Sequence, residues 1–308
     1  MNAFEKYGKL KVVETQLCDC SGNPIQLKGP STLGMVWYPE IINERAFENV
    51  HEWGANLIRL AMYTAEEDGY LTGGDREYTK DLIDKGVKYA TGLGMYVIID
   101  WHILSDGNPL DHKTEAIAFF EEMTAKYKGC DNIIYEICNE PNGEAATWEA
   151  VKEYAEAIVP VIRKNCPDSV ILIGTPNWSQ RVDQAADNPV EGENLMYSLH
   201  YYAASHKQPL RDKVIYALSK GLPIFFDEYS NCDASGNGII DEEEAHEWAR
   251  LADEKMISYA QWNLSYRDES SAMIKADCEK VCDWTDEEMT TTGLWMKARL
   301  SGKISYLK

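Results

Sequence analysis

The stretch IIYEICNEPNG, residues 133–143, decides the fold of this chain. Its first half is apolar and rich in β-branched residues, which is typical of a strand buried on both faces of a parallel sheet. Pro141 cannot donate a ladder hydrogen bond and Gly143 relaxes the backbone, so the strand must end there. The carboxylate of Glu140 is therefore predicted at the carboxyl end of a buried strand, where α/β barrels carry their chemistry. The three letters NEP alone would equally suit a loop that enters a helix.

Extended apolar runs alternate with amphipathic helical patterns along the rest of the chain. The clearest helix has apolar residues three and four apart between Trp148 and Ile162, with Thr147 as its N-cap. The predicted strands are residues 29–36, 55–62, 95–101, 132–138, 170–174, 195–201, 223–228 and 257–264. Eight such strands predict a single α/β domain, a (β/α)8 TIM barrel over residues 1–308.

The N-terminal segment, residues 1–28, precedes the first of these strands. Two alternating runs, residues 10–17 and 24–27, flank the turn signal Asp19–Asn23. This pattern predicts a β-hairpin that closes the bottom of the barrel.

Composition narrows the class of protein. The 308 residues are 44% hydrophobic and 26% charged, as in an ordinary globular protein. The net charge of −21 argues against nucleic acid as a partner, because phosphate binding needs a basic surface. Neither a membrane-spanning run nor the apolar segment of a signal peptide is present, so the chain could start in the cytosol or after a removed signal peptide. We expect the second, a secreted protein whose signal peptide is absent from this chain. The eight cysteines allow disulfides, but their spacing reveals no pairing.

Polar and aromatic side chains collect where the predicted strands end, which is the mark of a barrel enzyme. In chain order these residues are Trp37, Tyr38, Arg59, Tyr63, Asp100, Trp101, His102, Asn139, Glu140, Trp178, His200, Tyr202, Glu228 and Trp262. Packing alone would not place such groups at so many strand ends. The pattern predicts one site assembled from most of the strands.

A second carboxylate completes a pair. Glu228 ends the seventh predicted strand, and because it alternates with Asp227 we expect only one of the two to face the barrel axis. Glu140 and Glu228 would then face each other across the barrel mouth. Glycoside hydrolysis needs such a pair, one protonated to release the leaving oxygen and one ionised to attack the anomeric carbon.

The chain also shares several motifs with a known family. The shared motifs include LKG (27–29), IRLAMY (58–63), DWH (100–102), YEICNEPNG (135–143), WSQ (178–180), HYYA (200–203), DASGNG (233–238) and ESSA (269–272). Together they resemble glycoside hydrolase family five of clan A, most closely its bacterial cellulase-type endoglucanases. The resemblance covers nearly the whole chain.

The resemblance implies a retaining endo-β-1,4-glucanase without a cofactor or metal, acting as a monomer on β-glucan or cello-oligosaccharides. It implies Glu140 as acid/base and Glu228 as nucleophile, with Arg59 and Tyr202 keeping Glu228 ionised and oriented. The remaining substrate-binding residues that it implies are Trp37, Tyr63, His102, Asn139, Trp178, His200, Trp262 and Arg267. Among these, Asn139 would bind the sugar 2-hydroxyl, Trp37 and Trp262 the glycone sugars, and Trp178 the aglycone side.

Three positions depart from the family pattern. Leu33 stands where these cellulases usually carry His, and Arg267 where Lys is usual. The nucleophile lies in Asp227-Glu228-Tyr229-Ser230 instead of the usual Thr-Glu-Trp-Gly. These changes leave the polysaccharide preference open, so a mannanase, a xylanase or a mixed-linkage glucanase remains an alternative.

Two metal hypotheses have weaker support. Residues 233–244 fit the calcium loop template of an EF-hand, but a strand precedes them, and the resemblance supplies this loop as a family feature without calcium. A zinc site from His102, His112, His200 and His206 lacks the usual ligand spacing. The remaining rivals are a metal-dependent barrel hydrolase and a non-catalytic carbohydrate-binding barrel, and the second is opposed by the presence of both Glu140 and Glu228.

Overall fold

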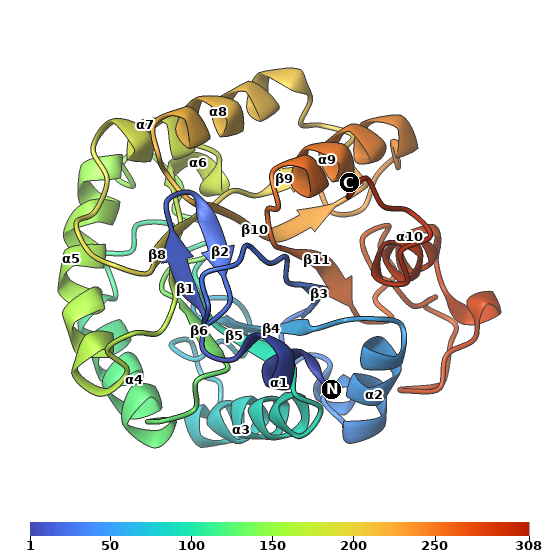
Figure 1. The fold of residues 1–308 in the computed structure, drawn as a ribbon. Helices are drawn as coiled ribbons and strands as arrows, with labels where there is room; N and C mark the ends of the chain where they lie inside the picture. The colour runs from blue at the N-terminus through green and yellow to red at the C-terminus, as the bar shows by residue number, and fades with distance from the viewer. Residues whose placement is uncertain (308) are drawn as a thin grey trace.

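Eight parallel strands close into a barrel in the computed structural model, which describes residues 1–307 (Figure 1). In spatial order they are β3 (Lys28–Thr32), β4 (Leu57–Tyr63), β5 (Tyr96–His102), β6 (Ile133–Glu136), β7 (Ile171–Ile173), β8 (Leu195–Ser198), β10 (Ile224–Ser230) and β11 (Tyr259–Leu264). Pairing of β11 with both β10 and β3 closes the ring. A two-residue strand, β9 (Tyr201–Tyr202), adds to the end of β10. All eight predicted strands are confirmed.

Helices surround the barrel and bury their apolar faces against the strands. They are α2 (Glu44–Glu52), α3 (Arg76–Gly92), α4 (Lys113–Lys126), α5 (Trp148–Asn165), α6 (Pro176–Ser179), α7 (Val182–Asp187), α8 (Gln208–Ser219), α9 (Glu242–Glu254) and α10 (Thr291–Leu300), with α1 (Ala3–Tyr7) at the N-terminus. The predicted register of α5 is confirmed, because the Thr147 hydroxyl accepts from the backbone N–H of Ala150.

The lower half of the barrel interior is apolar and the upper half is charged. Inward side chains near the amino ends of the strands, such as Tyr96, Ile98 and Phe225, form one buried cluster. One level higher the inward positions carry Arg59 and Glu136, both without exposed surface. The apolar layer therefore supports a polar layer at the carboxyl ends.

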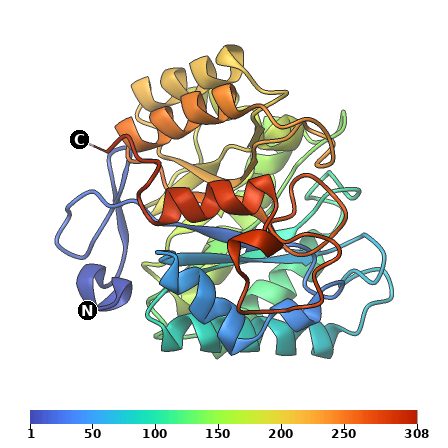
Figure 2. The same ribbon diagram turned by 90° about the vertical axis from the view of Figure 1, so that its right-hand side faces the viewer.

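The N-terminal hairpin closes the bottom of the barrel, as predicted, but its turn lies elsewhere (Figure 2). The paired strands are β1 (Lys11–Val13) and β2 (Gln16–Cys18), joined at Glu14 and Thr15. The segment 19–23, predicted to be the hairpin turn, forms a second turn after β2, closed by Asp19. Beyond it the chain pairs with β2 only briefly, through the bridge between Pro24 and Cys18 and the bond from the Ile25 N–H to the Leu17 carbonyl, and residues 24–27 form no longer strand.

All eight cysteines are free in the structure. Within residues 1–307, no helix combines the length and apolar character that crossing a membrane requires.

Candidate active site

A cavity of about 690 Å³ opens at the carboxyl ends of the barrel strands. Nine of the predicted site residues line it: Tyr63, His102, Glu140, Trp178, His200, Tyr202, Glu228, Trp262 and Arg267. Arg59 and Asn139 lie directly beneath, where they contact Glu228 and His102. Trp37 lies behind Tyr63, with ring centroids 4.5 Å apart. The structure therefore brings together the residues that the sequence places at separate strand ends.

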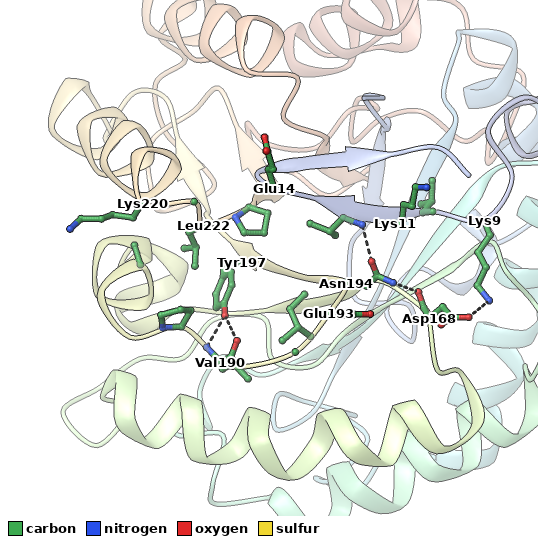
Figure 3. Close-up of a pocket in the computed structure, with 18 of the residues that line it drawn as sticks. Lys9, Lys11, Glu14, Asp168, Val190, Glu193, Asn194, Tyr197, Lys220 and Leu222 are labelled. Carbon is green, nitrogen blue, oxygen red and sulfur yellow. Dashed lines mark hydrogen bonds and ion pairs between the residues drawn. The ribbon is translucent and has the colours of Figure 1, made fainter. Parts of the chain in front are cut away.

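A second cavity, of about 780 Å³, lies at the opposite end of the barrel beside the hairpin (Figure 3). Its polar groups satisfy one another. Asn194 accepts from the backbone N–H of Val12 at 2.8 Å and donates to the carbonyl of Asp168 at 2.9 Å. The Tyr197 hydroxyl lies between the N–H and C=O of Val190. We therefore place the candidate active site in the first cavity, which holds the paired carboxylates.

Glu140 is held at the end of β6 by backbone bonds to the neighbouring strand end. The Asn139 and Glu140 N–H groups donate to the carbonyls of Trp101 and Ile103. Glu140 and Glu228 are both buried, and one carboxylate oxygen of each lies within 4.8 Å of the other. The two carboxyl groups thus face each other across a narrow gap.

Both Asp227 and Glu228 reach the site, which corrects the expectation that only one would. In the pairing of β10 with β11, Phe226 lies opposite Tyr259 and Tyr229 opposite Gln261. Two residues of β10 therefore match one of β11, which is a β-bulge. Because the bulge breaks the alternation, Asp227 and Glu228 turn to the same side between two outward aromatic side chains.

Arg59 lies at the centre of the buried polar layer. Its Nε and Nη2 donate to the two oxygens of Glu136, each at 2.7 Å. Nη2 also donates to Asn139 Oδ1 at 2.7 Å and lies 2.9 Å from Asp100 Oδ2. Nη1 donates to Glu228 Oε2 at 3.0 Å. The Tyr202 hydroxyl donates to the other oxygen of Glu228 at 2.8 Å, so the predicted contacts of Arg59 and Tyr202 with this carboxylate are present.

Asn139 connects Arg59 to His102 through two hydrogen bonds. Because its Oδ1 accepts from Arg59, its Nδ2 must donate to His102 Nε2, 3.1 Å away. The proton of the imidazole is then on Nδ1, which lies 2.5 Å from Asp100 Oδ2. Burial lowers the pKa of His102 to about 3 and raises that of Asp100 to about 8. His102 is therefore neutral and held in one orientation.

His200 contacts the other catalytic candidate. Its Nδ1 lies 2.9 Å from Glu140 Oε1, and its Nε2 lies 3.4 Å from Asp227 Oδ1. Burial acts to lower the pKa of His200, but its bonds to Asp227 and Glu140 outweigh burial and raise that pKa well above its ordinary value.

Aromatic side chains form the walls of the cavity. Trp262 stacks on His102 at 5.3 Å between ring centroids, and Tyr63 lies 4.1 Å from the same imidazole. Trp178 is 44% exposed and lies on a segment with positive φ at residues 177–179. That backbone turns its indole out over the cleft, where a planar ligand could lie against it.

The two departures at the rim have structural explanations. Leu33 is buried against Ala61, Tyr63 and Trp262. Arg267 is half exposed, and its Nε lies 3.1 Å from Glu269 Oε2. Leu33 thus packs beneath the aromatic wall and also lines the cavity, and Arg267 lines the cavity as well.

Two buried triplets have ligand atoms close enough together to hold a metal ion: Glu136, His200 and Asp227, and Glu140, His200 and Glu228. Both share His200, and Arg59 already donates to Glu136 and Glu228. A guanidinium at hydrogen-bond distance opposes a cation in the same place. The arrangement fits acid–base chemistry better than metal binding.

The loop over residues 233–244 uses its carboxylates within the protein. Asp233 Oδ1 accepts from the backbone N–H of Ser235, and a Cβ on Gly238 would lie 1.6 Å from Asp233 Oδ2. Asp241 caps α9 through the N–H of Glu244 and pairs with Lys207. These carboxylates therefore already have partners that a calcium ion would have to replace.

Three residues of the site were missed by the sequence reasoning: Glu136, Asp227 as an inward residue, and Ser198. The signal for Glu136 was present, because it shares the inward face of an otherwise apolar strand with Ile134. A charge at such a position needs a buried partner. That Asp227 and Glu228 both face inward depends on the bulge, which alternation alone cannot reveal.

Comparison with known proteins follows this geometry. Residues 18–268 match the family model "Cellulase (glycosyl hydrolase family 5)". The chain is 45% identical over 299 residues to Endoglucanase A of Butyrivibrio fibrisolvens, covering 96% of this chain and 69% of that protein. It is 47% identical over 296 residues to an endoglucanase of Clostridium saccharobutylicum, covering 96% of this chain and 65% of that protein.

Solved structures of cellulases have the same fold as this chain. Cellulase Cel5C_n has a TM-score of 0.93 at 41% identity, over 96% of this chain and 92% of that one. The catalytic domain of Thermobifida fusca endoglucanase Cel5A, solved with cellotetraose, has a TM-score of 0.92 at 36% identity, over 97% and 99%. The chain therefore spans nearly all of these solved catalytic chains, but only about two thirds of the two relatives named above.

Proposed function

The chain belongs to glycosyl hydrolase family 5, and we propose from this premise that it is a retaining endo-β-1,4-glucanase. The observation that carries the proposal is the gap between Glu140 and Glu228, whose nearest carboxylate oxygens lie within 4.8 Å. Retaining glycosidases keep their carboxyl groups about 5–5.5 Å apart, whereas inverting enzymes need about 6.5–9.5 Å to admit a water molecule. The narrow gap favours double displacement.

In this mechanism Glu228 attacks the anomeric carbon while Glu140 gives its proton to the departing glycosidic oxygen. Arg59 and Tyr202 each donate to one oxygen of Glu228, which holds the carboxylate in position for the attack. Glu140 then takes a proton from the water that hydrolyses the glycosyl-enzyme. His200, at 2.9 Å, orients Glu140 for both steps.

The proposed substrate is a β-1,4-glucan or a cello-oligosaccharide. A related endoglucanase at 36% identity was solved with cellotetraose, and the aromatic walls here offer flat faces to sugar rings. Asn139 would bind the sugar 2-hydroxyl, Trp262 the glycone side and Trp178 the aglycone side. Trp37 packs behind Tyr63, so its proposed contact with the glycone requires sugar to extend beyond the cavity.

We further propose that residues 1–308 act as one catalytic domain and as a monomer outside the cell. The cavity is lined by residues of a single chain. A polymeric substrate cannot enter a cell, so its hydrolysis must take place outside.

The direct test uses Glu140→Gln and Glu228→Gln on carboxymethylcellulose, beside mannan and xylan. Each change should lower kcat by several orders of magnitude and leave the fold intact, as expected for a member of a catalytic pair. Retention of more than about a tenth of wild-type kcat would remove that residue from its role. Faster hydrolysis of mannan or xylan than of cellulose would replace the substrate but keep the mechanism.

Azide separates the two roles. With Glu228→Ala and an activated aryl cellobioside, azide should take the place of the nucleophile and give the α-glycosyl azide. With Glu140→Ala, azide should attack the glycosyl-enzyme formed on Glu228 and give the β-glycosyl azide. The opposite pattern would exchange the two assignments.

A further inference from the structure

Asp227 is a buried carboxylate that the proposed mechanism leaves unused. It has no exposed surface and does not line the cleft, so it cannot touch a substrate. Its Oδ2 accepts from the Ser198 hydroxyl. Its Oδ1 makes no regular hydrogen bond within residues 1–307 and faces His200 Nε2, which makes none either, 3.4 Å away.

These two atoms complement each other. A buried carboxylate oxygen needs a donor, and an imidazole N–H can supply one. If His200 carries a proton on Nε2, both atoms are satisfied. His200 Nδ1 and Glu140 Oε1, 2.9 Å apart, can then share a second proton, which the nearby carboxylates keep in the site. The contacts from Asp227 to His200 and from His200 to Glu140 thus favour the protonated form of Glu140, which can act as an acid.

We propose that Asp227 is a positioning residue that acts through His200 to hold the proton on Glu140, and thereby extends activity to higher pH than a neutral residue in its place would allow. This inference rests on the proposed role of Glu140 as acid/base. The β-bulge in β10 brings Asp227 and Glu228 to the same side, because Asp227 follows the inward Phe225 in regular alternation and the bulge turns Glu228 inward beside it.

Other charged and titratable groups surround the same imidazole. They are Arg59 on β4, Asp100 and His102 on β5, Glu136 on β6, Tyr202 on β9 and Glu228 on β10. The Arg59 donors are already taken by Glu136, Asn139, Ser31 and Glu228. Within residues 1–307, the only ion pair of Asp227 is therefore with His200. Asp227 therefore affects mainly the proton affinity of the His200–Glu140 pair.

The proton balance is simple. In the first step the Glu140 proton moves to the glycosidic oxygen as the bond from C1 to that oxygen breaks and a bond from C1 to Glu228 forms. In the second step water gives a proton to Glu140 as its oxygen bonds to C1 and the bond to Glu228 breaks. Asp227 exchanges no proton; it holds a proton on His200 Nε2.

The test compares pH profiles of kcat/KM on cellopentaose for wild type, Asp227→Asn and Asp227→Thr. Removing the negative charge of Asp227 should lower the pKa of the His200–Glu140 pair by about 1–3, as is usual when a neighbouring opposite charge is lost. The basic limb should therefore move down by at least about one unit, with a tenfold or larger loss at pH 8 and less than about a threefold loss on the acid side. KM should not change. A dinitrophenyl cellobioside, whose leaving group needs no proton, should show a smaller loss.

Asp253→Asn is the matched control. Asp253 is also buried and pairs with Arg299, but it lies outside the cleft. This change should lower Tm without moving the basic limb. An unmoved basic limb in Asp227→Asn, or a loss that is uniform across pH, would overturn the proposal.

If neither Asp227 variant folds, nitrogen-15 NMR of histidine-labelled wild-type protein decides. The proposal predicts a proton on His200 Nε2 at pH 7; a bare Nε2 refutes it. A wild-type enzyme that hydrolyses no β-glycan would instead refute the proposed function, while the NMR result would still report on the contact between Asp227 and His200.

Discussion

Arg59→Lys should damage both stability and catalysis, although it keeps the charge. The guanidinium donates to Glu136, Asn139, Ser31 and Glu228 from three nitrogens. A lysine amine has three donors on one atom and cannot reach these partners together. At least two charge-assisted hydrogen bonds are lost, at roughly 1.5–3 kcal/mol each, which is about 3–6 kcal/mol. For a chain of this length that corresponds to roughly a 5–9 °C fall in Tm.

The assay is thermal unfolding at pH 6, followed by kcat on cello-oligosaccharides. We expect kcat to fall by at least about a hundredfold, because Glu228 loses one of the two donors that hold it in position. Arg299→Lys is the control, since Arg299 is also buried but binds one carboxylate, Asp253, away from the cleft. It should lower Tm less and leave kcat unchanged. A Tm for Arg59→Lys within about 2 °C of wild type, with kcat within threefold, would refute this account of the buried layer.

Three further changes test separate parts of the structure. Trp178→Ala should lower kcat/KM on long glucans about two- to tenfold and on aryl glycosides less, and equal losses would place the indole outside the aglycone side. Leu33→His should lower Tm without raising kcat/KM on cello-oligosaccharides, because the leucine packs under Trp262; a kinetic gain would instead reveal a missing sugar contact. Burial lowers the pKa of His206 to about 4, and its Nδ1 accepts from the Tyr202 N–H. The unfolded state therefore takes up this proton first, and up to about 3 kcal/mol of stability is lost as pH falls from 6.5 to 4. His206→Gln should lack that part of the slope in urea unfolding at pH 7 and 4.5.

The barrel was predictable because each strand is an apolar run bounded by turn signals. The run from Tyr96 to His102 and the break at Pro141 are local features, and local features determine where a strand begins and ends. The site followed from the same reasoning, since the carboxyl ends of parallel strands meet at one end of a barrel. Glu140, Glu228 and Arg59 could be placed together before any coordinates were known.

What could not be predicted depends on contacts between distant segments. The bulge that lets Asp227 and Glu228 both face inward is a mismatch between β10 and β11, and neither strand shows it alone. The hairpin turn lies at Glu14 and Thr15 because β2 pairs over three residues with β1, whereas the segment after the predicted turn adds only a short bridge at Pro24. Glu136 is recognised as a site residue only because the buried Arg59 needs an acceptor. Ser198 is recognised only because the buried Asp227 needs a donor.

The central claim is that Glu140 and Glu228 act as a closely spaced pair in a double displacement. Proton NMR of the first products released from cellopentaose tests it most directly, because the anomeric configuration is read before mutarotation. The narrow gap between the two carboxylates predicts that the β anomer forms first. Initial release of the α anomer would contradict the mechanism.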